Sequence, residues 1–205
     1  MNQRENIIFN INHYQNELFE SFKLLKILET KIFANHNNAE KELELTKRHI
    51  KYISFFTSCF LDIATTIKGL IDCELDWERI YFLKNGFVTI YEAINTFQKH
   101  QKELILLISE DYKSFEPNFQ ELQKQLKNFK KEYKFEEVIG KFRNKAGAHY
   151  DENFVIYFTN LKSIDKPISI KTISDFSNFL MKLISFWSDL IDLMHKESLD
   201  RRKDK

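Results

Sequence analysis

The chain has 205 residues, of which 43% are hydrophobic and 30% charged, and this is enough for one domain with a sizeable core. Its formal net charge of +1 excludes a global field that would draw it to nucleic acid or membrane, so any site for a polyanion must be a local patch. Glycine and proline, which punctuate strands and loops, number only 4 and 2, and this scarcity favours few and long elements.

Four stretches carry the apolar periodicity of amphipathic helices, at about 4–35, 40–71, 76–109 and 173–197. Their core-facing stripes include Ile7, Ile11, Tyr14, Leu18, Phe22, Leu25, Leu28 and Ile32, then Ile50, Ile53, Phe60, Ala64, Ile67 and Ile71, then Trp77, Ile80, Leu83, Phe87, Ile90, Ile94 and Phe97, and finally Ile173, Phe176, Leu180, Leu183, Trp187 and Leu190. Two shorter helices are predicted at 117–133 and 135–148, with Phe119, Leu122, Leu126, Phe129, Phe135, Val138, Ile139 and Phe142 on their apolar faces. Short loops between long helices make neighbours antiparallel. The prediction is an all-α, up-and-down bundle with two shorter helices before the C-terminal one.

The whole chain, 1–205, is expected to form a single helical domain. The run Phe154–Phe158 is open to three interpretations, namely a short strand, a buried helical turn or an extended lid. The segment Lys162–Thr172 contains Pro167 and is expected to be a loop. A frayed tail is predicted from about 198 to 205.

Cysteine content and hydropathy indicate where the protein works. Cys59 and Cys73 are too few for a disulfide framework and are expected to be reduced thiols, as is typical of the cytosol. No signal peptide is recognised at the N-terminus, and no run is expected to reach the length of a membrane span. We therefore expect a soluble, cytoplasmic protein with no membrane partner.

Most familiar site chemistry is missing from the sequence. A di-iron bundle needs Glu-x-x-His on two helices, and the nearest approach is the single pair Asp192 and His195. There is no Gly-x-Ser-x-Gly, no Gly-rich phosphate loop and no Cys-x-x-Cys. No metal and no other cofactor is expected. Four histidines are expected to be solvated surface residues: His13, His36, His49 and His100.

The stretch Phe142–Asp151 is different. From Lys124 to Lys145 the chain has eight Lys or Arg against three Glu, which makes a local phosphate-attracting surface. The small residues at 146–148 allow close approach of another backbone. His149 falls where Gly147 is expected to end a helix, and a helix C-terminus stabilises a protonated imidazole. A proton-exchanging His beside a permanently charged Arg is the minimum set for splitting a phosphodiester without metal.

Arg143-Asn144, four further residues and then His149 resemble the signature of HEPN domains, which are compact α-helical bundles. The motif covers about eight residues, and the helical context agrees over most of the chain. The resemblance implies a metal-independent ribonuclease of the kind found in toxin–antitoxin and phage-defence systems. It also implies that two protomers pair so that their motifs meet at the dimer interface.

The resemblance assigns roles residue by residue. Arg143 would bind the scissile phosphate and stabilise the charged transition state, and His149 would act as general acid or base. Asn144 would orient Arg143, His149 or the phosphate. Phosphate or RNA binding is expected of Lys134, Lys141, Lys145 and Tyr150. Some relatives have a tyrosine two residues after the His, whereas Tyr150 follows directly, and this departure puts any role for the tyrosine in doubt.

Helix geometry favours a shared site. Residues six apart on a straight helix are separated by about 120° of rotation and roughly 9 Å of rise, so Arg143 and His149 of one chain do not converge on one phosphate. Either the helix breaks at Gly147, or two chains each supply half of the site. A symmetric homodimer would place two Arg and two His around its axis.

Three alternatives stay open. The first is a non-catalytic HEPN-like module that binds a nucleotide, an RNA or a protein as sensor, scaffold or antitoxin. The second is a helical adaptor whose aromatic residues form a partner interface. In the third, the motif is a surface helix end where Arg143 pairs with Glu136, Glu137 or Asp151 and His149 caps. The expected partners are an RNA substrate and a cognate antitoxin or regulatory protein.

Overall fold

The computed structural model describes residues 2–34, 39–144, 155, 159 and 166–203. Its helices are α1 (Gln3–Ala34), α2 (Ala39–Asp72), α3 (Asp76–Glu110), α4 (Glu116–Glu132) and α6 (Lys166–Lys203). A 3-10 turn, η1 (Lys113–Phe115), precedes α4, and a π-helical turn, η2 (Glu136–Gly140), follows it. Every regular element in these ranges is helical, so the all-α prediction is confirmed.

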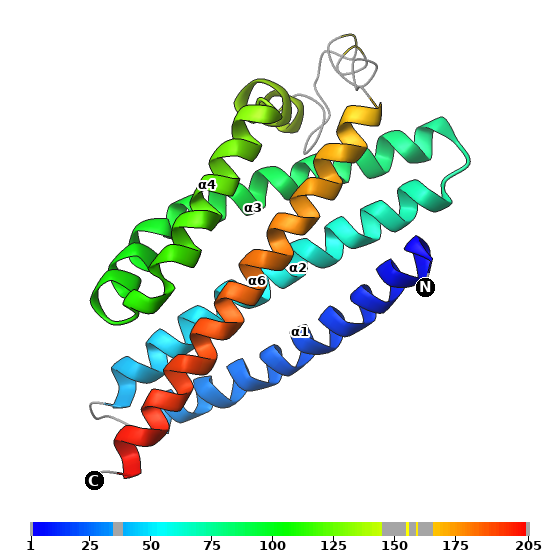
Figure 1. Cartoon of the computed structure of the whole chain (residues 1–205). Coiled ribbons are helices and arrows are strands. Elements are labelled where there is room, and N and C mark those ends of the chain that lie inside the picture. Colours follow the sequence, from blue (N-terminus) through cyan, green and yellow to red (C-terminus); the bar gives the residue numbers. More distant parts are fainter. Residues whose placement is uncertain (1, 35–38, 145–154, 156–158, 160–165, 204–205) are drawn as a thin grey trace.

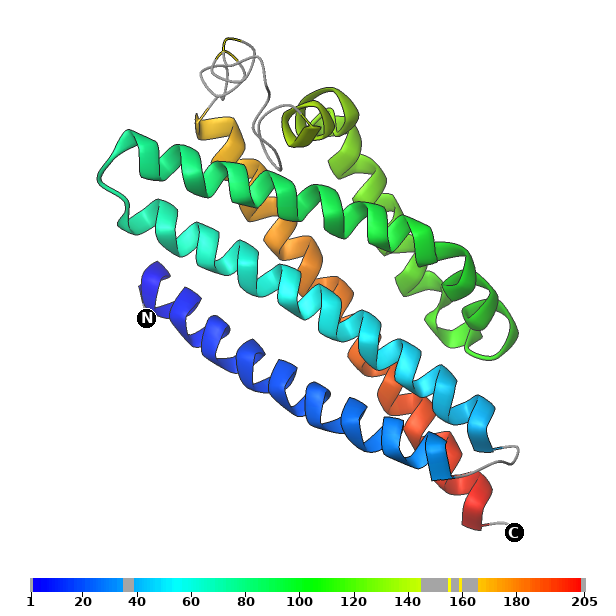
Figure 2. The same cartoon turned by 180° about the vertical axis from the view of Figure 1, so that it is seen from behind.

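Helix α2 lies at the centre of the bundle and contacts α1, α3 and α6. Along the chain, successive long helices reverse direction, and α6 crosses over α2 and α3 (Figures 1 and 2). Helix α4 packs on α6, and η2 packs on α3. The turn that carries Arg143 is therefore held against the middle of α3.

Local chemistry explains where two of the helices begin. The Glu78 carboxylate accepts hydrogen bonds from the backbone N–H groups of Glu74 and Leu75, both at 3.1 Å, and so starts α3. Pro167 is the second residue of α6, where a fixed φ and a missing N–H cost nothing. The predicted loop Lys162–Thr172 is therefore wrong from Lys166 onward, because Pro167 begins a helix rather than interrupting a loop. At its other end α6 continues to Lys203, through most of the segment expected to fray.

The core follows the predicted stripes. Its fully buried side chains include Phe60, Ile63, Leu83, Ile90, Ile94, Phe135, Ile139, Ile173, Phe176, Leu180 and Leu183. Some predicted members of the stripes are instead exposed: Phe22 (54%), Ile71 (43%), Trp77 (59%) and Val138 (45%). Ile71 and Trp77 flank the α2–α3 turn, where the bundle ends, and α1 packs mainly on one neighbour, α2, which leaves Phe22 at the edge of that contact.

One expectation about membranes, that no run of the chain reaches the length of a span, is wrong for helix α2. By length and composition alone, Glu44–Asp72 suffices to cross a bilayer, contrary to the prediction that no run approaches a span. The same segment contributes Phe60 and Ile63 to the core and contacts three other helices. Packing within the bundle therefore accounts for part of its apolar character, since 39% of the apolar window is buried.

Candidate functional site

The structure describes part of the Phe142–Asp151 stretch. Phe142, Arg143 and Asn144 are described, whereas Lys145, Gly147, His149 and Tyr150 lie outside the described residues. Lys134 and Lys141 are described and exposed, on either side of the η2 turn. The geometry available is therefore that of the phosphate-binding half of the predicted site.

Aromatic packing fixes η2 on α3. The Phe135 ring stacks on Tyr91 with centroids 5.6 Å apart, and Phe142 meets Phe87 edge-on at 5.3 Å. Gly140 also lies against Tyr91, where an added Cβ would make an ordinary van der Waals contact with Cε2 at 3.4 Å. Its backbone N–H donates to the Phe135 carbonyl at 2.7 Å, the five-residue spacing of a π turn. The turn thus delivers Arg143 onto the polar face of α3.

Three groups hold the Arg143 guanidinium. Its Nε and Nη2 donate to Glu92 Oε1 at 3.1 and 2.8 Å, and Nη1 donates to Asn144 Oδ1 at 3.3 Å. The guanidinium carbon lies 5.3 Å from the centre of the Tyr91 ring, which is cation–π distance. Among the described residues the carboxylate partner is Glu92, and neither Glu136 nor Glu137, whereas Asp151, the third partner of the surface-helix alternative, lies outside the described residues.

The contacts of Arg143 with Glu92, Asn144 and Tyr91 are called the Arg143 clamp. The clamp leaves Arg143 able to bind an anion. A guanidinium has five N–H donors, and the contacts with described residues use three of them. No other described residue accepts from the remaining donor on each Nη, and the side chain is 29% exposed. Paired Nη donors are the geometry that suits a phosphate. Asn144 lies where it can orient Arg143, and its role in catalysis stays a prediction.

Sequence reasoning missed Glu92 and Tyr91. Both lie on α3 beside the predicted apolar stripe, where charged and aromatic residues look like a solvated face. Their function arises only when η2 docks on α3, which brings Arg143 to a residue 51 positions earlier in the chain. No local pattern predicts that contact.

Four exposed lysines on α4 and on either side of η2 form an unpaired surface that precedes the clamp along the chain. Lys127, Lys131, Lys134 and Lys141 are exposed, and no described acidic group forms a salt bridge with any of them. Lys130, in contrast, lies 3.7 Å from Glu136. Unpaired exposed lysines are suited to phosphate contacts, because no internal ion pair must be broken.

A separate network joins α4 to α6 and occupies Lys171. Its Nζ lies 2.9 Å from Glu132 and 2.8 Å from Asp175, and the Tyr133 hydroxyl also donates to Asp175. Burial and the hydrogen bond to Asp175 raise the pKa of Tyr133 to about 12. Lys171 is therefore a structural cation rather than part of the unpaired surface.

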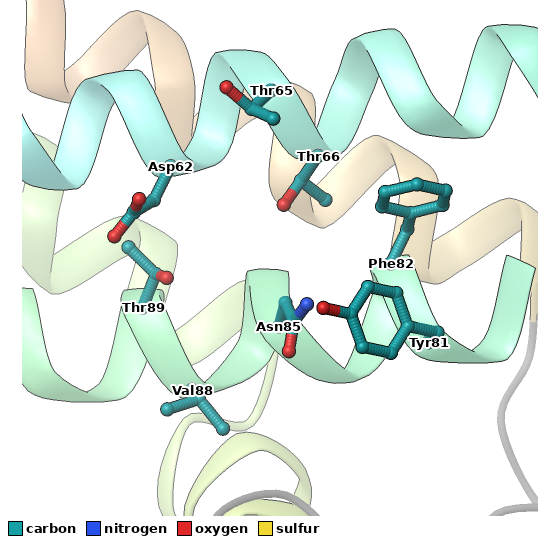
Figure 3. Close-up of a pocket in the computed structure, with 8 residues that line it drawn as sticks. All are labelled: Asp62, Thr65, Thr66, Tyr81, Phe82, Asn85, Val88 and Thr89. Carbon is teal, nitrogen blue, oxygen red and sulfur yellow. The ribbon is translucent and has the colours of Figure 1, made fainter. Parts of the chain in front are cut away.

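A pocket of about 310 Å³ opens between α2 and α3, and no sequence pattern predicted it. Figure 3 shows Asp62, Thr65 and Thr66 on α2, facing Tyr81, Phe82, Asn85, Val88 and Thr89 on α3. Val88 precedes Glu92 by four residues on the same helix, so the pocket begins one turn from the Arg143 clamp.

His36 lies outside the described residues, and among the other histidines expected to be solvated one is buried. His13 is exposed, and His100 Nδ1 is hydrogen-bonded to the Tyr52 hydroxyl at 2.6 Å. His49, predicted to be solvated, is only 4% exposed and packs on Trp187 with ring centroids 5.1 Å apart. The prediction for His49 was wrong because α6 crosses this face of α2.

Across the described ranges, no group of three His, Cys, Asp or Glu side chains could hold a metal ion.

Comparisons of the chain with models of protein families, with curated proteins and with solved structures find no match. The resemblance to HEPN domains therefore depends on the motif around Arg143 and on the helical architecture.

Proposed function

We propose that the protein is a metal-independent endoribonuclease of the HEPN type. The observation that carries the proposal is the Arg143 guanidinium, which is held by Glu92 and Asn144, remains 29% exposed and keeps two donors for a phosphate. The unpaired lysines on α4 and on either side of η2 add the local positive surface that an RNA backbone needs.

The proposed reaction uses the 2′-hydroxyl of the substrate. His149 takes the proton of that hydroxyl, and its oxygen attacks the adjacent phosphorus. The bond from phosphorus to the 5′-oxygen breaks, and that oxygen receives a proton from an imidazolium. Arg143 stabilises the charge that develops on the phosphoryl oxygens. The products are a 2′,3′-cyclic phosphate and a free 5′-hydroxyl.

We propose a homodimer as the active form, because Arg143 and His149 lie six residues apart and a two-fold axis would supply a second histidine as the acid. Sedimentation equilibrium should then show a species of twice 24.7 kDa. A monomer with full activity at every dilution would exclude the shared site. In a toxin–antitoxin or phage-defence setting, a cognate antitoxin would restrain this activity, and co-expression with it should relieve growth arrest.

The experiment that tests the function compares RNA with DNA of the same sequence in the presence of EDTA. We expect cleavage of single-stranded RNA with unchanged rate after chelation, and no cleavage of DNA, which lacks the attacking hydroxyl. End analysis should find 2′,3′-cyclic phosphates. An RNA methylated at every 2′-oxygen is the matched control and should stay intact, whereas its cleavage would exclude this mechanism.

The unpaired lysines give a second prediction. Lys131→Ala, Lys134→Ala and Lys141→Ala should each weaken RNA binding and reduce the slope of log K against log salt by about 0.7, the value for one phosphate contact of a single strand. Titrations at several salt concentrations measure the slope. Lys196→Ala is the control, because Lys196 is also exposed but lies near the C-terminal end of α6. An equal change in the control would mean that the lysines act only through net charge.

One observation favours a second candidate, a module that binds RNA or a nucleotide without cleaving it. Glu92 lies 2.8 Å from Arg143 and already compensates its charge. In such a module Arg143 would anchor η2 and leave binding to the lysines. RNA binding that survives Arg143→Ala, together with the absence of cyclic-phosphate products from the wild type, would support this candidate.

A further inference from the structure

We propose that the α2–α3 pocket binds one unpaired base of a single-stranded nucleic acid, adenine or cytosine, through its exocyclic amino group. The proposal deepens the proposed function by naming the part of the substrate that the protein reads, and in that sense it rests on it. Recognition of single-stranded RNA commonly uses unstacked bases that lie against aromatic rings and hydrogen-bond through their edges.

The lining of the pocket suits a neutral polar ring. It offers the Asp62 carboxylate, the Asn85 amide and the hydroxyls of Thr65, Thr66 and Thr89, with the Tyr81 and Phe82 rings on one side (Figure 3). Neither Lys nor Arg lines it, so the pocket is unsuited to a phosphate. Its volume of about 310 Å³ lies at the lower end of the range for small-molecule sites.

The Asp62 carboxylate should determine which bases bind, through the hydrogen bonds that it can accept. Within the described part of the chain the Asp62 carboxylate has no hydrogen-bond or salt-bridge partner, and it extends toward α3 in Figure 3. An ionised carboxylate only accepts hydrogen bonds. Adenine and cytosine present an amino group as a donor, whereas thymine and uracil present a carbonyl oxygen at the corresponding position. Asp62 should therefore favour amino-bearing bases.

Glycine shapes the pocket at one wall. A Cβ at Gly69 would lie 2.3 Å from the ring of Phe82, so the missing side chain lets that ring lie against the backbone of α2. The ring is thereby held as a wall of the pocket. Tyr81, which is 56% exposed, stands at the mouth and offers a second aromatic surface.

The pocket and the Arg143 clamp lie one helical turn apart along α3. Val88 lines the pocket, and Glu92, four residues later on α3, holds Arg143. The rise between the two positions is about 6 Å. Burial raises the pKa of Cys59 to about 12, with smaller contributions from Asp62 and Glu92, so both carboxylates lie within electrostatic range of the same thiol. A nucleotide can thus place its phosphate on Arg143 and a base in the pocket.

The experiment measures binding of short single-stranded DNAs made of dC, dA or dT by fluorescence anisotropy. DNA carries the same base edges and lacks the hydroxyl required for cleavage, so binding is observed without turnover. We expect the wild type to prefer dC and dA over dT, and Asp62→Asn to reduce that preference by about 10-fold. Asn85→Ala is a second pocket variant and should reduce it as well. Asp189→Asn is the matched control, because it removes an exposed carboxylate of α6 that lines no part of the pocket.

The outcomes separate this inference from the proposed function. Loss of the base preference in Asp62→Asn and its retention in Asp189→Asn support the pocket, whether or not the wild type cleaves RNA. If the wild type cleaves RNA but Asp62→Asn keeps the same base preference, the proposal that the pocket binds a base is wrong. The proposed ribonuclease activity is then unaffected. A wild type that binds all three DNAs equally also overturns the pocket. Circular dichroism of each variant shows whether it has kept the helical fold.

Discussion

Arg143→Ala is expected to lower the rate of RNA cleavage by about 100-fold to 1,000-fold, the loss seen when one donor to a developing oxyanion is removed. His149→Ala should lower it by about 100-fold to 10,000-fold, because proton transfer to or from the reacting oxygens is lost. Arg143→Lys should recover little of the activity, since an ammonium cannot donate to Glu92 and to a phosphate through one rigid fork. Cleavage of a labelled RNA under single-turnover conditions measures each rate.

The matched control for Arg143 is Arg79→Ala. Arg79 lies on α3, is 31% exposed against 29% for Arg143, and is held by Asp76 at 3.2 Å. It therefore has the same chemistry in a salt bridge away from the clamp. Its removal should leave the cleavage rate within about two-fold, since exposed ion pairs contribute roughly 0–1 kcal/mol. Wild-type rates for both Arg143→Ala and His149→Ala would exclude the proposed active site.

Helical periodicity predicted most of the fold. The stripes through Ile90 and Leu180 are buried as expected, because a bundle of long helices depends on repeated apolar contacts that the sequence records at fixed spacing. The ends of helices were less predictable. Pro167 is compatible with both a loop and a first helical turn, and the docking of α6 at this end, where Lys166 lies 2.7 Å from Asp76, is a tertiary contact.

The site was predictable only in part. The spacing of Arg143, Asn144 and His149 is a local pattern and can be recognised in one sequence. Glu92 and the residues that line the α2–α3 pocket lie more than 50 positions before Arg143 in the chain. Residues such as Asn85 and Glu92 resemble a solvated helix face until η2 covers part of α3. Their chemistry follows from packing, and it could not be read from the periodicity that predicted the helices.

Stability in acid is expected to depend on His49, because this titratable side chain is buried and no described group forms a hydrogen bond with its ring. Its side chain is 4% exposed, and neither Nδ1 nor Nε2 has a hydrogen-bond partner within the described residues. The Trp187 and Tyr52 rings lie beside it, with centroids 5.1 and 6.5 Å away. Burial, with a smaller contribution from Arg48 and against an opposing one from Glu103, lowers the pKa of His49 to about 4. The folded state therefore holds this imidazole neutral.

The consequence is a defined loss of stability in acid. The pKa of His49 is 6.5 in the unfolded chain and lower in the folded one. Its contribution to the free energy of unfolding is therefore fully present above pH 6.5 and is lost as the pH falls toward 4. The loss amounts to about 3 kcal/mol over that range. His49→Phe keeps a ring against Trp187 and removes both unpaired nitrogens, so at pH 7 it should raise the free energy of unfolding by about 1–3 kcal/mol.

Urea unfolding at a series of pH values from 7.5 to 4 tests the prediction, with the wild type, His49→Phe and His13→Gln measured side by side. The difference between His49→Phe and the wild type should grow by about 3 kcal/mol as the pH falls, because carboxylates titrate alike in both proteins and cancel. The difference for His13→Gln, at an exposed position of α1, should stay near zero throughout. A constant difference for His49→Phe would mean that the imidazole has the same pKa in the folded and the unfolded chain, and it would exclude the proposed effect of burial on His49.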